Sequence, residues 1–539
     1  MTLIVMGRRR GSGGANRTRY DLIPTASATM QPDYTALSTL RSAGATTPWT
    51  DPYSGLSVYR LRTDAEGDCA LAYSNGGPYV SLPDNGQYWV VVGGINVGGV
   101  NRIHVVGFTP GSGRTTAPIN TGFADNAMGD VAVGWSHVSA TTFYRVQNKV
   151  LRKYTWNGST MTEVTGGVWP KDFSAQAPNS TRLSWMTHDT SDRIFTVCAA
   201  SDDKIMAWDS QTDTLYTVTS TDFAASVPSG TTIDEGYVDH SGRYVMVKLS
   251  PLGWLLWDLQ NDRWSAAAGH VSHPSLGNGG GVAVGGFSIV SSTTAPMNTG
   301  GNVVAEMRPR LTFIPITSDG QSALSMMAAL NDGSIYGANA TYLSASPAHS
   351  STSHNQTTAA FSEQWSIIGA NNGPGLNTGS GVNWSTGWSL TSGAIYQRTW
   401  AVGARAVTGA FELSADGTTV NAQPTAAASL GAMVAGTYFV DMGTRTLYMW
   451  RSDSTAVTTT NTEPRYSAAV QVGVFAEQWT SPSTVKAVAF TYQHPRQNTY
   501  EYSVFASSSP DGRVVVFNTD FGRLSGTRSV CAVALPWGS

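Results

Sequence analysis

The pattern of apolar and polar positions along the chain is typical of short strands, and it is clearest in a doubled stretch between residues 185 and 264. The first copy reads HDTSDRIFTV (188–197) and KIMAWDSQTDTLYTV (204–218), and the second reads VDHSGRYVMV (238–247) and GWLLWDLQNDRW (253–264). In each copy a polar turn precedes a strand of alternating bulky and small residues, and a second strand ends in Trp-Asp. The pattern predicts two equivalent antiparallel units.

The spacing of the two copies indicates the fold. Arg193 and Arg243 are 50 positions apart, and a period near 50 with several short strands per unit is typical of β-propeller blades. Similar turn-then-strand patterns recur at 82–94, 415–422, 437–453 and 509–522. We therefore predict an all-β propeller of four-stranded antiparallel blades. At roughly 45–70 residues per blade, seven blades are expected and eight are the alternative; two similar hairpins of a β-sandwich are the alternative fold.

The chain divides into a leader and a propeller. Residues 1–50 form a basic, Gly/Ser-rich arm without helical or strand periodicity, and residues 51–539 form the propeller. The polar, Gly-rich stretch 340–400 is predicted to form long loops on one propeller face. We expect the strand near Ser57–Arg62 to pair with the strand near Val530–Leu535, because this closure hides both edges.

Composition and charge narrow the class of protein. Only 13% of residues are charged, 57 are Gly and 17 are Trp, which suits short strands, tight turns and a substantial core. A net charge of −3 argues against nucleic acid as the main partner. Three widely spaced cysteines, Cys69, Cys198 and Cys531, form neither a metal-spaced pair nor a disulfide framework, so we expect them to be buried and free.

Targeting signals are not expected. Four apolar residues between Thr2 and Gly7 are too few for a signal peptide, and no 18-residue apolar run predicts a membrane span. The predicted location is a virion or an extracellular particle, with the cytoplasm as the alternative.

Several residues are candidates for binding or chemistry. Trp384, Trp388 and Trp400 could stack on sugar rings or pack in a core. The acids Asp234-Glu235 and Asp202-Asp203 could form glycosidase pairs or cap turns. The repeated Glu-Gln-Trp at 363–365 and 477–479 is interpreted as marking equivalent strands.

Histidines raise the possibility of a metal site. His270 and His273 lie in a loop just after the doubled stretch, and a third histidine from another blade, His494 beside Gln493, could complete a divalent metal site. The alternative is that these histidines are hydrogen-bonding loop or core residues.

One segment resembles a known family. HPR (494–496) followed by SPDGRVVVFNTDFG (509–522) is similar to the last blade of oligogalacturonate lyase-like propellers, although NTYEYSVFAS separates the two motifs here. The resemblance implies a propeller, and it implies a lyase with a metal site of histidines and a glutamine. Only His494 matches that site by motif. An Mn- or Ca-type ion there would acidify the C5 proton of a sugar.

Three functions remain open. The first is a structural or receptor-binding propeller of a virus-like particle, such as a phage tail or capsid appendage, which needs no cofactor. Its arginine-rich arm would dock on other particle subunits, and a cell-surface polysaccharide is a further ligand; the arginines are Arg8, Arg9, Arg10, Arg17 and Arg19. The second is the polysaccharide lyase. The third is a protein-interaction scaffold similar to WD-repeat propellers, disfavoured by the low charge and by the lack of Gly-His…Trp-Asp spacing.

Overall fold

The computed structural model describes most of the chain outside its leader and the stretch 265–355. The described residues are 22–24, 37–69, 71, 78–97, 100–124, 132–223, 230–238, 242–250, 253–260, 262–264, 356–360, 365–370, 384–400, 407–466, 473–478, 481–492, 494, 505–524 and 528–536. The predicted docking arginines of the leader lie outside these residues, as do His270, His273 and Gln493.

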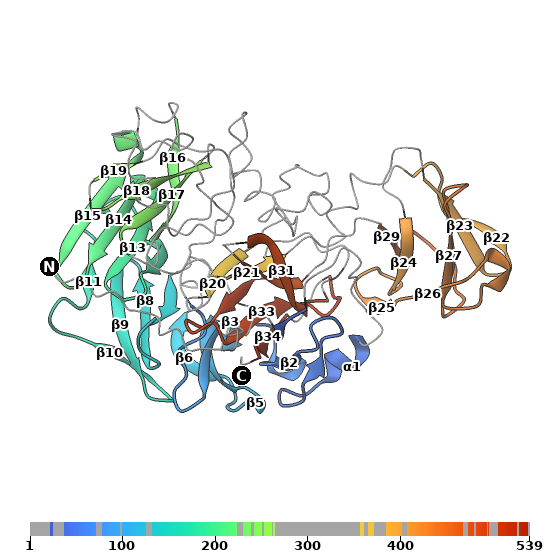
Figure 1. Cartoon of the computed structure of the whole chain (residues 1–539), viewed down its shortest axis with the longest axis horizontal. Coiled ribbons are helices and arrows are strands. Elements are labelled where there is room, and N and C mark those ends of the chain that lie inside the picture. Colours follow the sequence, from blue (N-terminus) through green and yellow to red (C-terminus); the bar gives the residue numbers. More distant parts are fainter. Residues whose placement is uncertain are drawn as a thin grey trace, which may run out of the picture.

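In the described part of the chain, six sheets of short antiparallel strands make up the body, and the architecture is a β-propeller (Figure 1). Four sheets follow chain order. Their strands are β3 (Tyr88–Val97), β4 (Val100–Thr109), β5 (Gly113–Arg114) and β6 (Ile119–Ala124); β7 (Val133–Trp135), β8 (Thr142–Gln147), β9 (Val150–Trp156), β10 (Met161–Val164) and β11 (Lys171–Asp172); β12 (Ser184–His188), β13 (Ile194–Ala199), β14 (Lys204–Asp209) and β15 (Thr214–Thr219); and β16 (Thr232–Val238), β17 (Tyr244–Ser250), β18 (Gly253–Asp258) and β19 (Arg263–Trp264).

The doubled stretch forms two of these sheets, β12–β15 and β16–β19, as the sequence predicts. Both sheets contain the same hydrogen bond between a tryptophan and an aspartate. Trp208 Nε1 donates to Asp213 at 2.8 Å, and Trp257 Nε1 donates to Asp262 at 3.2 Å. Both indoles are almost fully buried, so each ties the end of its strand to the following turn.

The first and last strands close the propeller. The closing sheet has the order β1 (Trp49–Thr50), β2 (Ser57–Arg60), β34 (Ser529–Ala534), β33 (Val514–Thr519) and β32 (Ala506–Ser508). Val58 pairs with Val533 and Arg60 pairs with Cys531, which confirms the predicted closure. The short helix α1 (Leu37–Ser42) buries Leu37 and Leu40 against this sheet.

The sixth sheet is interrupted by an insertion. Its strands are β20 (Gln356–Ala360), β21 (Trp365–Ala370), β30 (Gly473–Gln478) and β31 (Ser481–Phe490). β21 and β30 are antiparallel neighbours in which Trp365 pairs with Gln478, so the described residues of the two Glu-Gln-Trp motifs lie on adjacent strands of one sheet.

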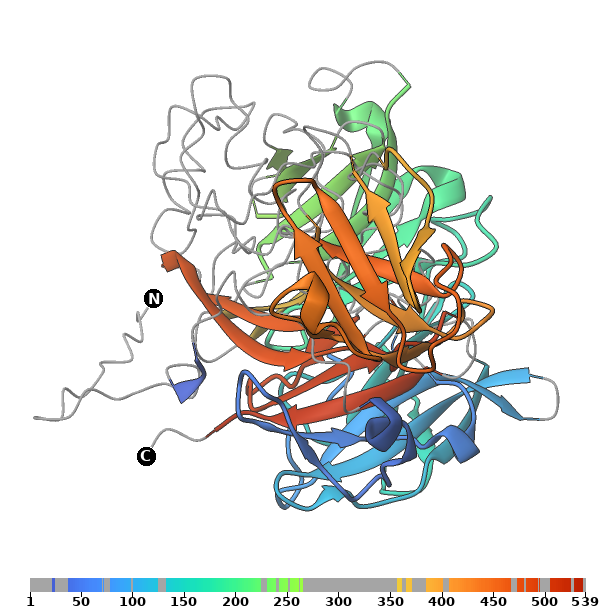
Figure 2. The same cartoon turned by 90° about the vertical axis from the view of Figure 1, so that its right-hand side faces the viewer.

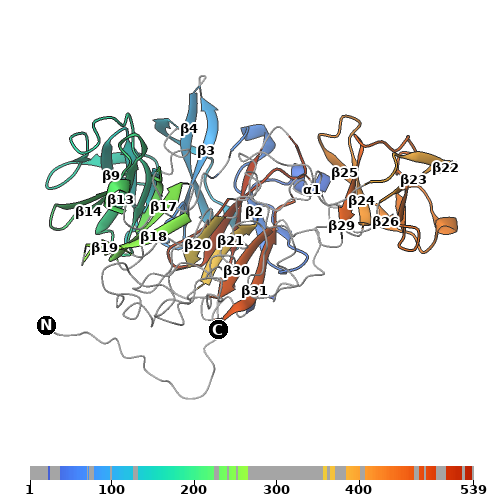
Figure 3. The same ribbon diagram turned by 90° about the horizontal axis from the view of Figure 1, so that it is seen from above.

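Between β21 and β30 the chain forms an inserted module, here defined as the described residues of 384–466, with two small sheets. The outer sheet contains β22 (Ser389–Ser392), β23 (Ile395–Thr399), β28 (Thr446–Trp450), β27 (Thr437–Asp441) and β26 (Thr425–Ala426); the inner sheet contains β25 (Val420–Ala422), β24 (Val407–Leu413) and β29 (Thr462–Tyr466). The module lies at one end of the long axis, with the outer sheet farthest from the body (Figures 1 and 3). Within 340–400, where the sequence predicts long loops, the described residues form the strands β20 and β21 of the body and β22 and β23 of the module; β23 forms because β28 offers it a hydrogen-bonding edge.

Apolar side chains fill the spaces between neighbouring sheets. One buried cluster extends from Tyr59 through β3–β14 to β33, a second joins the closing sheet to β30, β31 and the inner module sheet, and a third lies between β12–β15 and β16–β19. The three cysteines are free and buried, as expected from their spacing, and burial raises the pKa of the Cys69 thiol to about 11. In the described part of the chain, no helix is long and apolar enough to cross a membrane.

Candidate functional site

A buried polar cluster joins two neighbouring blades. It is formed by His137 in the turn between β7 and β8, by His188 at the end of β12, and by Asp192 in the turn that leads into β13. One potential ligand atom of each residue lies within 4.8 Å of the other two. Among the described residues, this is the group of three His, Cys, Asp or Glu side chains close enough to share a metal ion.

The turn before β13 places Asp192 toward the preceding blade. Asp189 accepts hydrogen bonds from the backbone N–H groups of Arg193 and Ile194, which fixes the turn. Asp192 has a φ of 56°, a left-handed conformation that Asp tolerates better than most residues. Its carboxylate therefore projects away from its own strand.

The Asp192 carboxylate binds donors from both blades. It accepts hydrogen bonds from the Ser136 and Tyr144 hydroxyls and from the backbone N–H of His137 at 2.9 Å. His188 Nδ1 lies 3.1 Å from Asp192 Oδ1. Burial of Asp192 raises its pKa, but His188 and the other donors outweigh this and hold the pKa well below its usual value. Asp192 is therefore a carboxylate at neutral pH.

The two imidazoles lie against each other at a tilt; His188 is buried and His137 is partly buried. Their ring centroids are 4.3 Å apart at an angle of 34°. Burial, reinforced by the neighbouring His188, lowers the pKa of His137 to about 3. His137 Nδ1 lies 2.9 Å from the Asp189 carbonyl oxygen, which can only accept, so Nδ1 carries the proton and Nε2 the lone pair.

Sequence reasoning missed this cluster as a site. It assigned Asp192 to a turn and did not consider His137, because the two residues are 55 positions apart and belong to different blades. The available signal was a histidine shortly before each of two strands of neighbouring blades, His137 before β8 and His188 before β13.

The predicted metal ligand that the structure describes, His494, lies elsewhere. It is fully buried beside the closing sheet, where its backbone N–H donates to Asp520 at 3.0 Å. Its proposed partners His270, His273 and Gln493 lie outside the described residues, so the lyase-type metal site stays a prediction.

The candidate glycosidase acids have structural partners. Lys248 Nζ contacts Asp234 at 2.9 Å and Glu235 at 2.6 Å, and Glu235 also accepts the Tyr237 hydroxyl. Asp202 accepts the Ser180 and Asn179 N–H groups, and Asp203 accepts that of Ile233 at 2.6 Å. These contacts favour the turn-capping interpretation for Asp202-Asp203 and an ion-pair role for Asp234-Glu235.

The three predicted sugar-stacking tryptophans pack within the inserted module. Trp400 is buried, Trp384 meets it edge-to-face at 6.4 Å, and Trp388 packs against the same apolar cluster. Arg398 lies 4.1 Å above the Trp384 ring. Their role in glycan binding stays a prediction, and their geometry is that of core side chains.

A different aromatic set lies on the outer sheet of the module. Phe439 pairs with Tyr448 across β27 and β28, and their rings stack with centroids 6.0 Å apart. Trp450 lies two positions beyond Tyr448 and therefore shares its side of the sheet. All three are half-buried. We call Phe439, Tyr448 and Trp450 the aromatic face.

The aromatic face points away from the inner sheet of the module. The alternate residues Leu447 and Met449 are buried on the other side, and Tyr438 approaches Gly409 of β24 there. Because the inner sheet lies between the outer sheet and the body, the aromatic face is at the far end of the molecule; Figure 2 views the molecule from this end.

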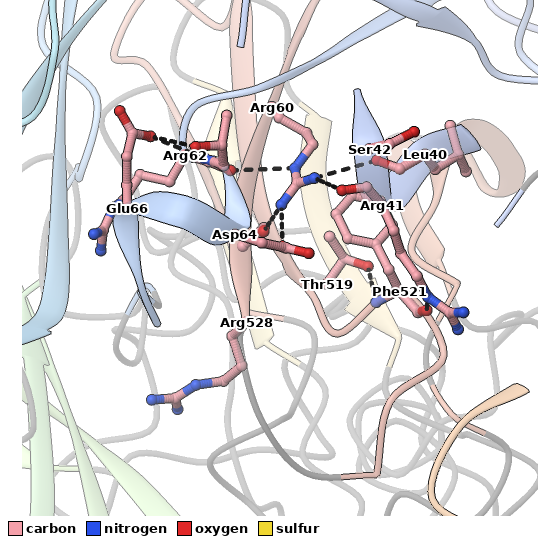
Figure 4. Close-up of polar contacts among 12 residues, drawn as sticks. Leu40, Arg41, Ser42, Arg60, Arg62, Asp64, Glu66, Thr519, Phe521 and Arg528 are labelled. Atoms are coloured by element: carbon pink, nitrogen blue, oxygen red, sulfur yellow. Dashed lines mark hydrogen bonds and ion pairs between the residues drawn. The ribbon is translucent and has the colours of Figure 1, made fainter. Parts of the chain in front are cut away.

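Figure 4 shows a second polar network, which lies where the propeller closes. Arg60 is fully buried and its guanidinium makes five hydrogen bonds; the acceptors are the carbonyls of Leu40, Arg41 and Arg62, Asp64 Oδ1 and Ser529 Oγ. Asp64 also pairs with Arg523 at 2.5 Å. Burial raises the pKa of Asp64, but the two arginines outweigh it and the pKa is lowered. This network has the character of a structural seam, because the buried Arg60 guanidinium has five N–H groups and makes five hydrogen bonds.

Comparison with known proteins finds similarity in structure only. No protein-family model matches the sequence, and no curated protein sequence matches it. A crystal structure of oligogalacturonate lyase from Vibrio parahaemolyticus aligns with 91% of this chain and 96% of its own, at 8% identity and a TM-score of 0.37. The WD40 repeats of RRP9 align with 91% of this chain and 100% of their own, at 9% identity and a TM-score of 0.36.

An oligogalacturonate lyase in complex with manganese also aligns, with 91% of this chain and 96% of its own, at 10% identity and a TM-score of 0.27. These proteins include both lyases and WD40-repeat proteins, so the comparison assigns no activity. The chain is similar in structure to oligogalacturonate lyase and to WD40-repeat propellers over about 90% of its length.

Proposed function

We propose that the protein is a binding propeller of a virus-like particle, such as a phage tail or capsid appendage, and that the inserted module carries its ligand site. The ligand is a polysaccharide of a cell surface. The observation that carries this proposal is the aromatic face, which lies on the part of the molecule farthest from the body (Figures 1 and 3).

The chemistry of the aromatic face suits a sugar. The apolar faces of sugar rings pack on aromatic rings, and such contacts contribute roughly 0.5–1.5 kcal/mol each beyond buried area. The neighbours of the aromatic face across the strands include Gln397 opposite Tyr448 and Thr399 opposite Thr446. Their amide and hydroxyl groups can exchange hydrogen bonds with sugar hydroxyls.

The body would serve as the scaffold in this proposal. Six blade sheets are described, and we propose seven in total, with eight as the alternative, from the sequence period of about 50 residues. The arm with Arg8, Arg9, Arg10, Arg17 and Arg19 would dock on other particle subunits. An experimental structure of the full chain tests the blade count.

The proposal is tested by titrating the full chain with soluble polysaccharides, namely a neutral glucan, a galactan and polygalacturonate. We expect one of them to bind and the affinity to fall about tenfold in Tyr448→Ala and in Trp450→Ala. Val434→Ala is the matched control, because Val434 is an exposed apolar side chain of the same module outside the aromatic face. Equal affinities for the wild type and both aromatic variants would refute the site.

A further inference from the structure

We propose that His137, His188 and Asp192 bind one divalent transition-metal ion of the Zn²⁺ class between two neighbouring blades. This site belongs to the propeller body and is independent of the aromatic face. It also differs from the residues that the lyase resemblance suggests, since none of the three belongs to the segments that carry that resemblance.

The spacing of the three side chains is close to that of a metal site. Zinc holds imidazole nitrogen and carboxylate oxygen at about 2.0–2.2 Å, which places neighbouring ligand atoms roughly 3.4 Å apart. His188 Nδ1 and Asp192 Oδ1 are 3.1 Å apart, and the whole set lies within 4.8 Å. Side-chain movements of about 1 Å would complete the geometry.

The hydrogen bonds around the cluster fix the orientation of its side chains in the way that is common for metal ligands. Metal-binding histidines commonly donate their second ring nitrogen to a carbonyl or carboxylate, which fixes the ring and its tautomer. His137 Nδ1 does this with the Asp189 carbonyl. The Ser136 and Tyr144 hydroxyls hold the Asp192 carboxylate in the same way.

A second observation, on the His188 ring, supports a bound ion. His188 is 3% exposed, and its Nδ1 atom, which lies 3.1 Å from Asp192 Oδ1, is buried without a hydrogen bond of good geometry among the described residues. A buried polar atom that makes no hydrogen bond costs roughly 1–3 kcal/mol, so native structures rarely leave one. A metal ion held by His188 Nδ1, the His137 imidazole and the Asp192 carboxylate would give this atom a partner.

The ligand types select the metal. Two imidazoles and one carboxylate suit Zn²⁺ and related transition ions, whereas Ca²⁺ and Mg²⁺ prefer oxygen ligands alone. Three protein ligands leave one position of a four-coordinate ion for water.

The test is metal uptake by the full chain. The protein is stripped with a chelator, incubated with Zn²⁺, freed of excess metal and analysed for zinc by mass spectrometry. We expect one ion per wild-type chain and a rise of a few degrees in Tm when Zn²⁺ is about a hundredfold above Kd. His137→Gln and His188→Gln should each weaken binding by at least about tenfold.

His104→Gln is the matched control, because His104 is 4% exposed and lies outside the cluster. It should still bind one ion. A wild-type chain that takes up no zinc, or equal uptake by wild type and the two cluster variants, would overturn the proposal.

A measurement on the wild type covers the case in which a cluster variant does not fold. Co²⁺ replaces Zn²⁺, and its visible absorption reports coordination directly. Intense bands of four- or five-coordinate Co²⁺ with nitrogen ligands support the site. The weak spectrum of aqueous Co²⁺ contradicts it.

Discussion

Aspartate side chains hold many of the turns between blade strands. Asp189 binds two backbone N–H groups of its own turn, and Asp209 binds Arg193 across a hairpin and the N–H of Gln211 beyond it. Asp213 and Asp262 receive the indole N–H groups of Trp208 and Trp257. Short acidic side chains therefore fix the strand ends in a chain with few other charges.

The ion pair of Asp209 with Arg193 predicts a pH dependence. Burial raises the pKa of Asp209, but Arg193 and the Gln211 amide outweigh it and lower the pKa to about 2. Because the pKa of Asp209 is lower in the folded state than its value of about 3.9 in the unfolded state, the ionised carboxyl stabilises the fold at pH values above about 3.9. This stabilisation is lost as the pH falls through about 2. Asp209→Asn should therefore lower the free energy of unfolding by about 2 kcal/mol near neutral pH.

Urea unfolding near neutral pH and again at about pH 3 measures this difference, which should shrink at the lower pH. Asp84→Asn, a change at an exposed turn acid, serves as the control and should change the stability little at either pH. A wild-type-to-variant difference that stays constant with pH would contradict the ion-pair account.

At the scale of elements, closure depends on β2 and β34. Their pairing was predictable, because the first and last apolar strands of a propeller would otherwise each leave an open edge. The buried Arg60 that stabilises the pairing was not predictable, since its acceptors come from α1, from the segment after β2 and from β34.

Replacing Arg60 with lysine tests the seam. Lysine cannot reproduce the five hydrogen bonds of the planar guanidinium, and Asp64 would lose a partner. Arg60→Lys should lower the free energy of unfolding by about 3 kcal/mol. Arg102→Lys should cost less than about 0.5 kcal/mol, because the Arg102 guanidinium makes an exposed bond to Gly122. Thermal unfolding compares Arg60→Lys with Arg102→Lys. Equal unfolding midpoints of the two variants would contradict a stabilising role of the Arg60 network.

The inserted module attaches to the body through backbone contacts near Gly522. Val420 N–H donates to the Gly522 carbonyl at 2.8 Å, and Leu524 N–H donates to Thr418 at 2.7 Å. A methyl group on Gly522 would lie 2.8 Å from the Leu37 side chain and 3.2 Å from Val420 Cβ, and its φ of +73° favours glycine.

Gly522→Ala should therefore destabilise the protein by about 3 kcal/mol, which combines the backbone strain with the steric overlap. Gly111→Ala is the control for backbone strain alone, because Gly111 has a φ of +80° and open space around it. It should cost about 1 kcal/mol. If both variants unfold at the same denaturant concentration, the close contact at Gly522 does not contribute to the loss of stability, and the prediction is wrong.

At the scale of the whole molecule, the features that could be predicted from the sequence are those that arise from a repeat or from neighbouring residues along the chain. The repeat placed β12–β19, and the terminal apolar strands predicted the closure. The inserted module was hidden, because its hairpin at 437–453 has the same turn-then-strand pattern as a blade. The His137–Asp192 contact was hidden for another reason: it forms between blades, and strand periodicity carries no information on which turns meet.

We propose that this propeller binds a polysaccharide and does not cleave it. The most direct test incubates the full chain with polygalacturonate and related pectic and ulvan-type oligosaccharides, with Mn²⁺ or Ca²⁺ added, and follows the absorbance of unsaturated products. We expect no absorbance increase, and we expect the same protein to bind at least one polysaccharide of the titration series. An increase that disappears in His494→Ala would contradict the account and establish the lyase alternative.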